Sequence, residues 1–365
     1  MHQRQLGKSG PKLSAIGIGA MSFTDFYGAT SEAASHAVLT NALDLGVNHI
    51  DTANVYGGGL SESVIGRFLA KQGAQKTKLF HIATKAGIAV DKETGRRYFD
   101  NSPAYLQAEL DASLARLGLD YVDLYYIHRR DSETPIEEVT ETLAAMVKAG
   151  KIGGFGFSEI APTSLYRAAA IHEIAAVQSE YSLSVRSPEM GLVQATAALG
   201  VSLVAFSPLG RSLLTDKPHS RATAVASGWL KSNPRFVEPN LTANIEASAR
   251  FRALATEMGI ARRRLRLHGC CIKRRISCQF REQDRLIIFA NIVTARQNHY
   301  HPTRWVASRQ FYLSAGRMAT VMQMPNGGWS RALLLGLGHV GTALARVFKL
   351  VPLTTGTFDC PFFRF

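Results

Sequence analysis

Residues 47–56, which read VNHIDTANVY, contain the feature that decides the fold, a short strand that ends on a charged residue. Val47–Ile50 predicts the strand, because apolar and β-branched residues dominate it. Asp51 follows it directly, and Tyr56 comes five residues later. An ionisable residue at this position is typical of a parallel sheet, in which chemistry gathers at the carboxyl ends of the strands.

Two later strands end in the same way. Leu79–Thr84 predicts a strand that runs into Lys85, and Tyr121–Ile127 predicts one that runs into His128. Carboxyl ends of parallel strands lie at the same edge of a sheet. Asp51, Tyr56, Lys85 and His128 are therefore expected to form one site.

The rest of the first 261 residues alternates short apolar runs with amphipathic helical stretches, after an opening hairpin over Arg4–Ser14. The other predicted strands are Ala15–Ile18, Ile152–Phe157, Ala175–Gln178 and Val201–Ala205. The predicted helices include Ala33–Leu45, Ser63–Ala70, Leu106–Leu117 and Val139–Ala149, with expected start signals at Ser102-Pro103, Thr134-Pro135-Ile136-Glu137 and Ser187-Pro188. This alternation is typical of a doubly wound sheet or of a (β/α)₈ barrel. The first strand lacks the third glycine of a dinucleotide-binding fingerprint, which favours the barrel.

Each ionisable residue also has a structural interpretation. An aspartate after a strand is usually a turn or cap residue, and a histidine there is usually a packed imidazole. Lys85 is less easily explained, because a lysine that ends an apolar strand needs a buried partner, and Asp51 is the candidate. An ammonium beside Tyr56 is expected to lower the pKa of the phenol, so that it can act as an acid. His128 is then expected to orient a substrate carbonyl as a neutral imidazole.

In this order and context, Asp51, Tyr56, Lys85 and His128 resemble the catalytic tetrad of the aldo-keto reductases. Further matching segments are 46–53, 61–66, 119–124, 150–152, 178–182 and 206–210. The resemblance covers residues 1–261 and implies a (β/α)₈ barrel that reduces a small aldehyde or ketone with NADPH, reversibly. It also implies that Tyr56 donates the proton.

The resemblance further assigns the cofactor and substrate residues. It implies that Ser158 and Gln178 hydrogen-bond the nicotinamide amide and that Tyr181 stacks on the ring. The loop that contains Ser207, Leu209 and Arg211 is implied to cover the pyrophosphate. Phe23, Tyr27 and Arg129 lie on loops expected to line the substrate cleft, with packing at its rim as the alternative. No metal site is implied.

The composition changes abruptly after residue 261. Residues 1–261 contain 25 basic and 25 acidic residues, whereas residues 262–365 contain 17 and 3, which accounts for the whole net charge of +14. The four cysteines also lie there. We expect two parts, a barrel over 1–261 and a poorly ordered 262–365 segment that does not resemble the family, from a shifted reading frame or a fusion. The eighth β/α unit is then incomplete, with Leu286–Val293 or Ala332–Leu335 as a substitute strand.

Three other readings of the 262–365 segment are weaker. His268, Cys270, Cys271 and Cys278 do not have a known zinc-ligand spacing. The Gly336-x-Gly338-x-x-Gly341 fingerprint has too little chain after it for a dinucleotide-binding unit. The basic excess, confined to this segment and with few interleaved aromatics, does not indicate a nucleic-acid partner.

Loss of the eighth unit is expected to weaken NADPH binding, because the family's last elements bind the adenosine 2′-phosphate. The alternative function is therefore a non-catalytic barrel, either the product of a disrupted gene or a nucleotide-binding sensor subunit. The sequence has no membrane-length apolar run and no signal-peptide core, so a cytoplasmic protein is expected. Nothing in it indicates an oligomeric state.

Overall fold

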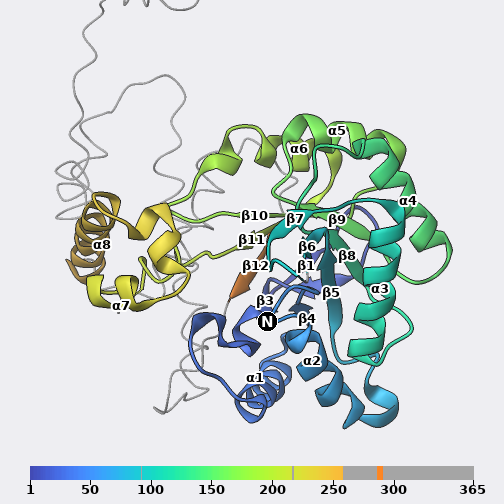
Figure 1. Cartoon of the computed structure of the whole chain (residues 1–365), viewed down its shortest axis with the longest axis horizontal. Coiled ribbons are helices and arrows are strands. Elements are labelled where there is room, and N and C mark those ends of the chain that lie inside the picture. The colour runs from blue at the N-terminus through green and yellow to red at the C-terminus, as the bar shows by residue number, and fades with distance from the viewer. Residues whose placement is uncertain (92, 216–217, 258–285, 291–365) are drawn as a thin grey trace, which may run out of the picture. The chain divides into compact units, whose positions relative to one another are not determined.

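The computed structural model describes residues 1–91, 93–215, 218–257 and 286–290, and shows a closed barrel of eight parallel strands (Figure 1). Around the ring the strands are β3 (Ile16–Gly19), β4 (His49–Asp51), β5 (His81–Ala86), β8 (Leu124–Ile127), β9 (Phe155–Ser158), β10 (Ala176–Glu180), β11 (Ser202–Phe206) and β12 (Leu286–Ala290). The predicted barrel is confirmed.

The position of the eighth strand is occupied by β12, which pairs in parallel with β11 on one side and with β3 on the other. It lies within Leu286–Val293, one of the two segments expected to substitute for the missing strand. The other segment, Ala332–Leu335, lies outside the described residues. So do the cysteines, the glycine fingerprint and whatever follows β12.

Six helices cover the outside of the barrel (Figure 1). They are α1 (Glu32–Asp44), α2 (Leu60–Ala70), α3 (Pro103–Leu117), α4 (Ile136–Lys148), α5 (Pro162–Ile171) and α6 (Leu192–Leu199). Each carries apolar side chains on one stripe, and these bury a continuous core against the strands, with Leu39, Ile65, Leu110, Val139 and Leu165 fully covered.

One of the three expected helix starts has the predicted chemistry. The Ser102 hydroxyl accepts from the Tyr105 N–H, and Pro103 occupies the first turn. Thr134 does not form a capping box, because its hydroxyl donates to Asp131 and the helix starts after Pro135 without a side-chain cap. The Ser187-Pro188 prediction is also wrong: it lies in the short 3₁₀ helix η4 (Ser187–Glu189), and α6 starts later.

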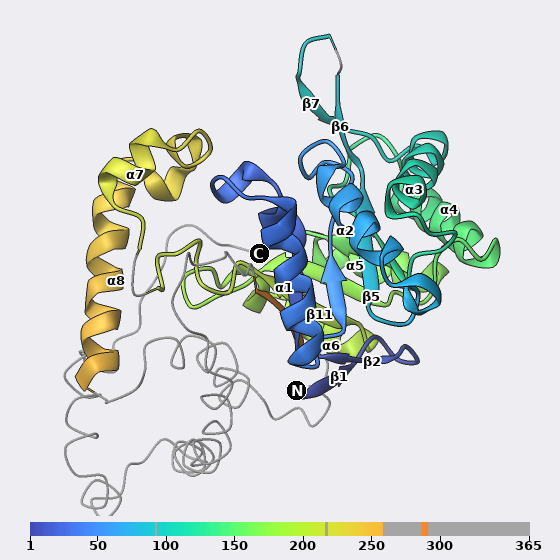
Figure 2. The same cartoon turned by 90° about the horizontal axis from the view of Figure 1, so that it is seen from below.

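Two hairpins lie outside the ring. β1 (Gln3–Gln5) pairs with β2 (Lys12–Ser14), which confirms the predicted hairpin. Its Leu6 and Leu13 pack against side chains of the barrel interior and close its amino-terminal end. The second hairpin, β6 (Ile88–Val90) with β7 (Arg97–Phe99), leaves the carboxyl end of β5 and projects from the barrel (Figure 2).

The remaining elements lie after β11 or in connecting loops. They are α7 (Arg221–Ala226), α8 (Asn240–Glu257), and the 3₁₀ helices η1 (Ala20–Phe23), η2 (Asp25–Tyr27), η3 (Gly73–Gln75), η5 (Leu230–Ser232) and η6 (Pro234–Phe236). The elements after β11 share a small apolar cluster that includes Leu213, Leu230 and Phe236. In the described part of the chain, none of the helices has the length and apolarity needed to cross a bilayer.

Strand alternation determines which side chains reach the barrel interior. Ala83, Leu124, Tyr126 and Ala176 form one interior cluster. Successive side chains on a strand point to opposite faces, so residues two places further on face the same interior, nearer its carboxyl end. Lys85, His128 and Gln178 occupy those places. The barrel geometry therefore brings the predicted polar residues to one mouth.

The space around the Tyr126 ring depends on Gly156, the neighbouring residue on β9. A Cβ atom at Gly156 would lie 2.7 Å from the Tyr126 ring and 2.2 Å from the carbonyl oxygen of Ala176. Both distances are shorter than real contacts allow, so this position requires glycine.

Candidate active site

Lys85 and Asp51 form a buried ion pair at the carboxyl ends of β5 and β4. The Lys85 ammonium also donates to the carbonyl oxygen of Thr52 at 2.8 Å and to the hydroxyl of Tyr56 at 3.3 Å. Lys85 is fully buried and Asp51 nearly so. The predicted pairing of Lys85 with Asp51 beside the phenol is therefore present in the structure.

His128 lies against Tyr56 on the other side, one residue beyond β8. The two rings meet edge to face with centroids 5.7 Å apart. The Nδ1 atom of His128 is buried and has no hydrogen-bond partner in the described part of the chain. Burial, with Lys85, Arg129 and Arg97, holds the pKa of His128 well below its usual range. The imidazole is thus neutral at neutral pH, as expected.

The electrostatics of Tyr56 differ from the prediction. Burial and the Asp51 carboxylate raise the pKa of Tyr56 above its ordinary value, against the opposing effect of Arg129 and Arg211. The expectation of a lowered pKa is wrong in its net direction, because burial of the phenol and the Asp51 carboxylate raise the pKa although the Lys85 ammonium lies 3.3 Å from the hydroxyl. The phenol consequently keeps its proton throughout the neutral range.

Burial also acts on the ion pair itself. It raises the pKa of Asp51 and lowers the pKa of Lys85, while the attraction between the two groups opposes both changes. Gln178 contributes to the same balance, because its Nε2 donates to the second carboxylate oxygen of Asp51 at 2.8 Å. Asp51 thus has a hydrogen-bond partner on each oxygen.

Ser158 and Gln178 lie side by side at the ends of β9 and β10, where the strand register pairs them. Both are buried. The Ser158 hydroxyl accepts from Nη1 of Arg129 at 3.0 Å. A hydroxyl and an amide next to the tetrad suit the carboxamide of a nicotinamide ring, and Tyr181, 8% exposed just beyond β10, adds an aromatic face. Its hydroxyl donates to Glu189 at 3.0 Å.

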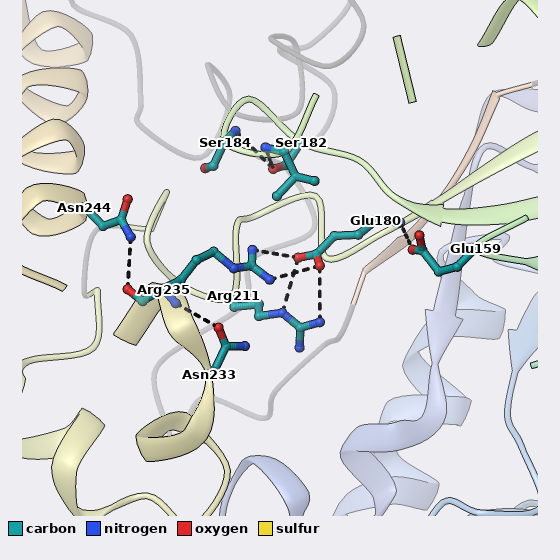
Figure 3. A network of polar contacts seen from close by, with 9 residues as sticks. Glu159, Glu180, Ser182, Ser184, Arg211, Asn233, Arg235 and Asn244 are labelled. Atoms are coloured by element: carbon teal, nitrogen blue, oxygen red, sulfur yellow. Dashed lines mark hydrogen bonds and ion pairs between the residues drawn. The ribbon is translucent and has the colours of Figure 1, made fainter. Parts of the chain in front are cut away.

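Glu180, the last residue of β10, anchors two arginines from later in the chain (Figure 3). Its carboxylate accepts from Arg235 at 2.9 and 3.0 Å and from Arg211 at 3.2 and 3.4 Å. Its backbone N–H donates to the Glu159 carboxylate at 2.7 Å. Burial raises the pKa of Glu180, but the two guanidiniums outweigh it and hold the value below its ordinary level. Neither Glu180 nor Arg235 was predicted from the sequence to belong to the site.

The loop expected to cover a pyrophosphate starts at Ser207. Ser207 and Arg211 have positive φ angles of 50° and 51°, and the Gly210 N–H bonds back to the carbonyl of Ser207 at 2.9 Å. Leu209 lies within this turn and is partly exposed. The Arg211 guanidinium lies 5.3 Å from the centre of the Trp229 ring. The loop is thus tightly folded, and its one charged residue, Arg211, shares the Glu180 carboxylate with Arg235.

The three predicted substrate residues have different environments. Phe23 is 3% exposed and belongs to the main core, so the packing alternative describes it better. Tyr27 is partly exposed and lies edge to face with Trp229 at 6.0 Å. Arg129 lies next to His128, half-buried, and donates to the carbonyl of that residue at 2.6 Å. Arg129 is thus in hydrogen-bond contact with His128 and Ser158.

A second buried network contacts Thr84, the residue before Lys85. None of its residues was predicted from the sequence to belong to the site. Glu62 of α2, fully buried, accepts from the hydroxyl of Thr84, the residue before Lys85. It also accepts from Nε of Arg116 on α3 at 2.6 Å. The signal in the sequence was a glutamate at the third position of the helix that follows the Tyr56 loop. The Glu62–Thr84 hydrogen bond joins the start of α2 to β5.

Ser158, Gln178 and Tyr181 thus lie together as expected for a nicotinamide site, whereas the prediction about the adenosine end concerns residues 262–365, of which the structure describes only Leu286–Ala290. His268, Cys270, Cys271 and Cys278, which were considered as zinc ligands, also lie outside the described residues. Within the described residues no three His, Cys, Asp or Glu side chains are grouped as metal ligands.

Comparison with known sequences identifies a family. Residues 15–266 match the profile described as the aldo/keto reductase family. Over 249 residues the chain is 39% identical to the aldo-keto reductase yakc (NADP(+)) of Schizosaccharomyces pombe. The aligned region covers 67% of this chain and 73% of that protein. Over 252 residues it is 36% identical to a probable aldo-keto reductase of Glycine max, with 69% and 71% covered.

Solved structures share the fold. A glycerol dehydrogenase of Gluconobacter oxydans superimposes with a TM-score of 0.65 at 23% identity, covering 90% of this chain and 98% of the other. An aldo-keto reductase of Bacillus halodurans in its holo form gives 0.62 at 24% identity, covering 92% and 96%.

Proposed function

Because the chain belongs to the aldo/keto reductase family, we propose that it reduces an aldehyde or ketone to the alcohol with NADPH, Tyr56 being the proton donor. The observation that supports this most directly is the Lys85–Tyr56 contact at 3.3 Å beside the Asp51 ion pair. The S. pombe relative carries NADP(+) in its name, and the same cofactor is proposed here.

The residues that hold the nicotinamide are Ser158, Gln178 and Tyr181. The Gln178 amide uses Nε2 on Asp51, so its carbonyl oxygen is the atom to accept from a carboxamide. The Ser207–Arg211 turn and its arginine hold the pyrophosphate. When bound, the cofactor would supply the hydride for the carbonyl carbon. The protein side chains donate the proton and orient the carbonyl.

Tyr56 then transfers its proton to the carbonyl oxygen. Its raised pKa keeps the phenol protonated before the reaction. The phenolate that remains faces the Lys85 ammonium, which donates a hydrogen bond to it. Asp51 keeps Lys85 charged and in place. His128, neutral in its buried position, donates an N–H to the carbonyl oxygen and orients it.

The test is oxidation of NADPH with 4-nitrobenzaldehyde by the wild-type chain, by Tyr56→Phe and by Tyr166→Phe. Tyr166 is 48% exposed on α5 and serves as the matched control. We expect Tyr56→Phe to lose about 10²–10⁴-fold in kcat, the usual contribution of a positioned acid. If Tyr56→Phe were as active as the control Tyr166→Phe, Tyr56 would not be the proton donor. An inactive wild type would support the non-catalytic barrel.

A further inference from the structure

The Arg129 guanidinium carries a positive charge that no carboxylate balances in the described part of the chain. Its Nη1 donates to two neutral oxygens, the carbonyl of His128 at 2.6 Å and the hydroxyl of Ser158 at 3.0 Å. Arg116 and Arg211, by contrast, each pair with a buried or nearly buried glutamate. A half-buried, unbalanced cation beside the tetrad needs an explanation.

The free edge of this guanidinium has the geometry for a carboxylate. Arginine has five N–H groups, and Nη1 carries two of them. The other three, on Nε and Nη2 of Arg129, have no acceptor among the described residues. Arg129 as a whole is only partly buried, and neither atom is among the described polar atoms that are buried without a partner. Two parallel N–H groups from one edge bind a carboxylate in bidentate fashion, and the anchored Nη1 holds that edge still.

The position of this edge is next to the expected reaction centre. Arg129 directly follows His128, whose ring packs against Tyr56. A second cation, Arg97 on β7, also lies near enough to His128 to contribute to the low pKa of that imidazole. Arg97 forms no ion pair with a described residue. Arg129 and Arg97 are thus two cations near His128 that form no ion pair with a described residue.

We propose that the substrates are carbonyl compounds that also bear a carboxylate, which the Nε–Nη2 edge of Arg129 binds while Arg97 adds long-range attraction. This inference rests on the proposed carbonyl reduction and specifies its substrate class. The competing explanation is that Arg129 only braces β8 against β9 through His128 and Ser158. A brace would affect all substrates equally, whereas a carboxylate site discriminates by charge.

The first experiment compares carboxybenzaldehydes with nitrobenzaldehydes, using the 3- and 4-isomers of each. A nitro group has the planar shape of a carboxylate without its charge. The measured quantity is the carboxy-to-nitro ratio of kcat/KM, in which general losses of folding or cofactor binding cancel. We expect Arg129→Gln to lower this ratio about tenfold or more, the usual effect of losing charge-assisted hydrogen bonds. Arg129→Lys should lower the ratio less, because lysine keeps the positive charge but lacks the two parallel N–H groups of the guanidinium.

The hairpin provides the matched control. Arg97→Gln is expected to lower the ratio about two- to threefold, and more so at low salt, since an exposed charge acts through screened attraction. Arg96→Gln removes the same charge one residue away and should leave the ratio unchanged. An unchanged ratio in Arg129→Gln with both substrate pairs would overturn the proposal.

A second experiment needs no turnover. Calorimetric titration of the full chain with benzoate and with benzamide separates the charge from the ring. We expect the wild type to bind benzoate more tightly than benzamide. Arg129→Gln should weaken benzoate binding about tenfold or more and should leave benzamide binding unchanged. Equal affinities of the wild type and of Arg129→Gln for benzoate would overturn the proposed carboxylate site. If the wild type does not reduce 4-nitrobenzaldehyde, the proposed reduction fails, while the titration still decides the carboxylate site.

Discussion

Replacing Glu62 by Gln should destabilise the barrel far more than removing a surface carboxylate. The Glu62 side chain is fully buried and accepts hydrogen bonds from Thr84 and from Arg116. Glutamine keeps the size but turns one acceptor into a donor, which then faces a donor. One charge-assisted hydrogen bond is lost, worth about 1.5–3 kcal/mol.

The Arg116 charge adds to this cost only in part. Breaking a fully buried ion pair costs about 3–5 kcal/mol, but the Arg116 side chain is 27% exposed and regains water. We therefore expect a loss of about 2–3 kcal/mol in the free energy of unfolding. For a domain of this size that corresponds to a fall in Tm of roughly 4–6 °C.

Thermal and urea unfolding followed by circular dichroism measure this loss, with Glu32→Gln as the matched control. Glu32 also pairs with an arginine, Arg67, at 2.8 Å, but both side chains are largely exposed, so we expect no measurable change in Tm. The double variant Glu62→Gln/Arg116→Met should recover part of the loss. A Tm for Glu62→Gln as high as that of Glu32→Gln would refute the supporting role of this network.

Two further predictions concern the barrel. Burial lowers the pKa of His49 to about 3, and that of His81 in the same direction. Stability should therefore be full above pH 6.5 and fall by about 2 kcal/mol for His49 between pH 7 and 5, because the unfolded state takes up the proton. His49→Asn should flatten this slope, measured by urea unfolding at each pH, and an unchanged slope would exclude His49 as its source. Gly156→Ala should lower the free energy of unfolding by about 3 kcal/mol or more, and Tm with it, because its Cβ would meet the backbone oxygen of Ala176 at 2.2 Å. Gly228→Ala, with open space around it, is the control, and equal Tm values would contradict the argument.

The barrel itself was predictable because its signals are local. Apolar runs such as Leu79–Thr84 and helix stripes such as Leu106–Leu117 depend on spacing along a few residues, and the observed elements agree within a few positions. Helix starts were less predictable. Thr134 had the right spacing for a cap, but its hydroxyl bonds to Asp131, a choice that depends on the folded loop.

The gathering of Asp51, Tyr56, Lys85 and His128 also followed from the sequence. Closed parallel barrels bring all carboxyl strand ends to one mouth, so a residue's place at a strand end determines its place in the molecule. Composition added the break after residue 261. These conclusions required strand order and alternation, which are properties of the chain alone.

Charge balance at the mouth was decided by the tertiary structure. Burial and Asp51 raise the pKa of Tyr56 although Lys85 lies beside it, and Glu180 pairs with Arg211 and Arg235, which the sequence places far away. Arg129 keeps an open edge. Ion pairing and pKa depend on distances of a few ångströms and on the exclusion of water. Packing between distant segments sets both, and therefore the sequence determined where the chemistry lies while the folded structure determined the charge that each group presents.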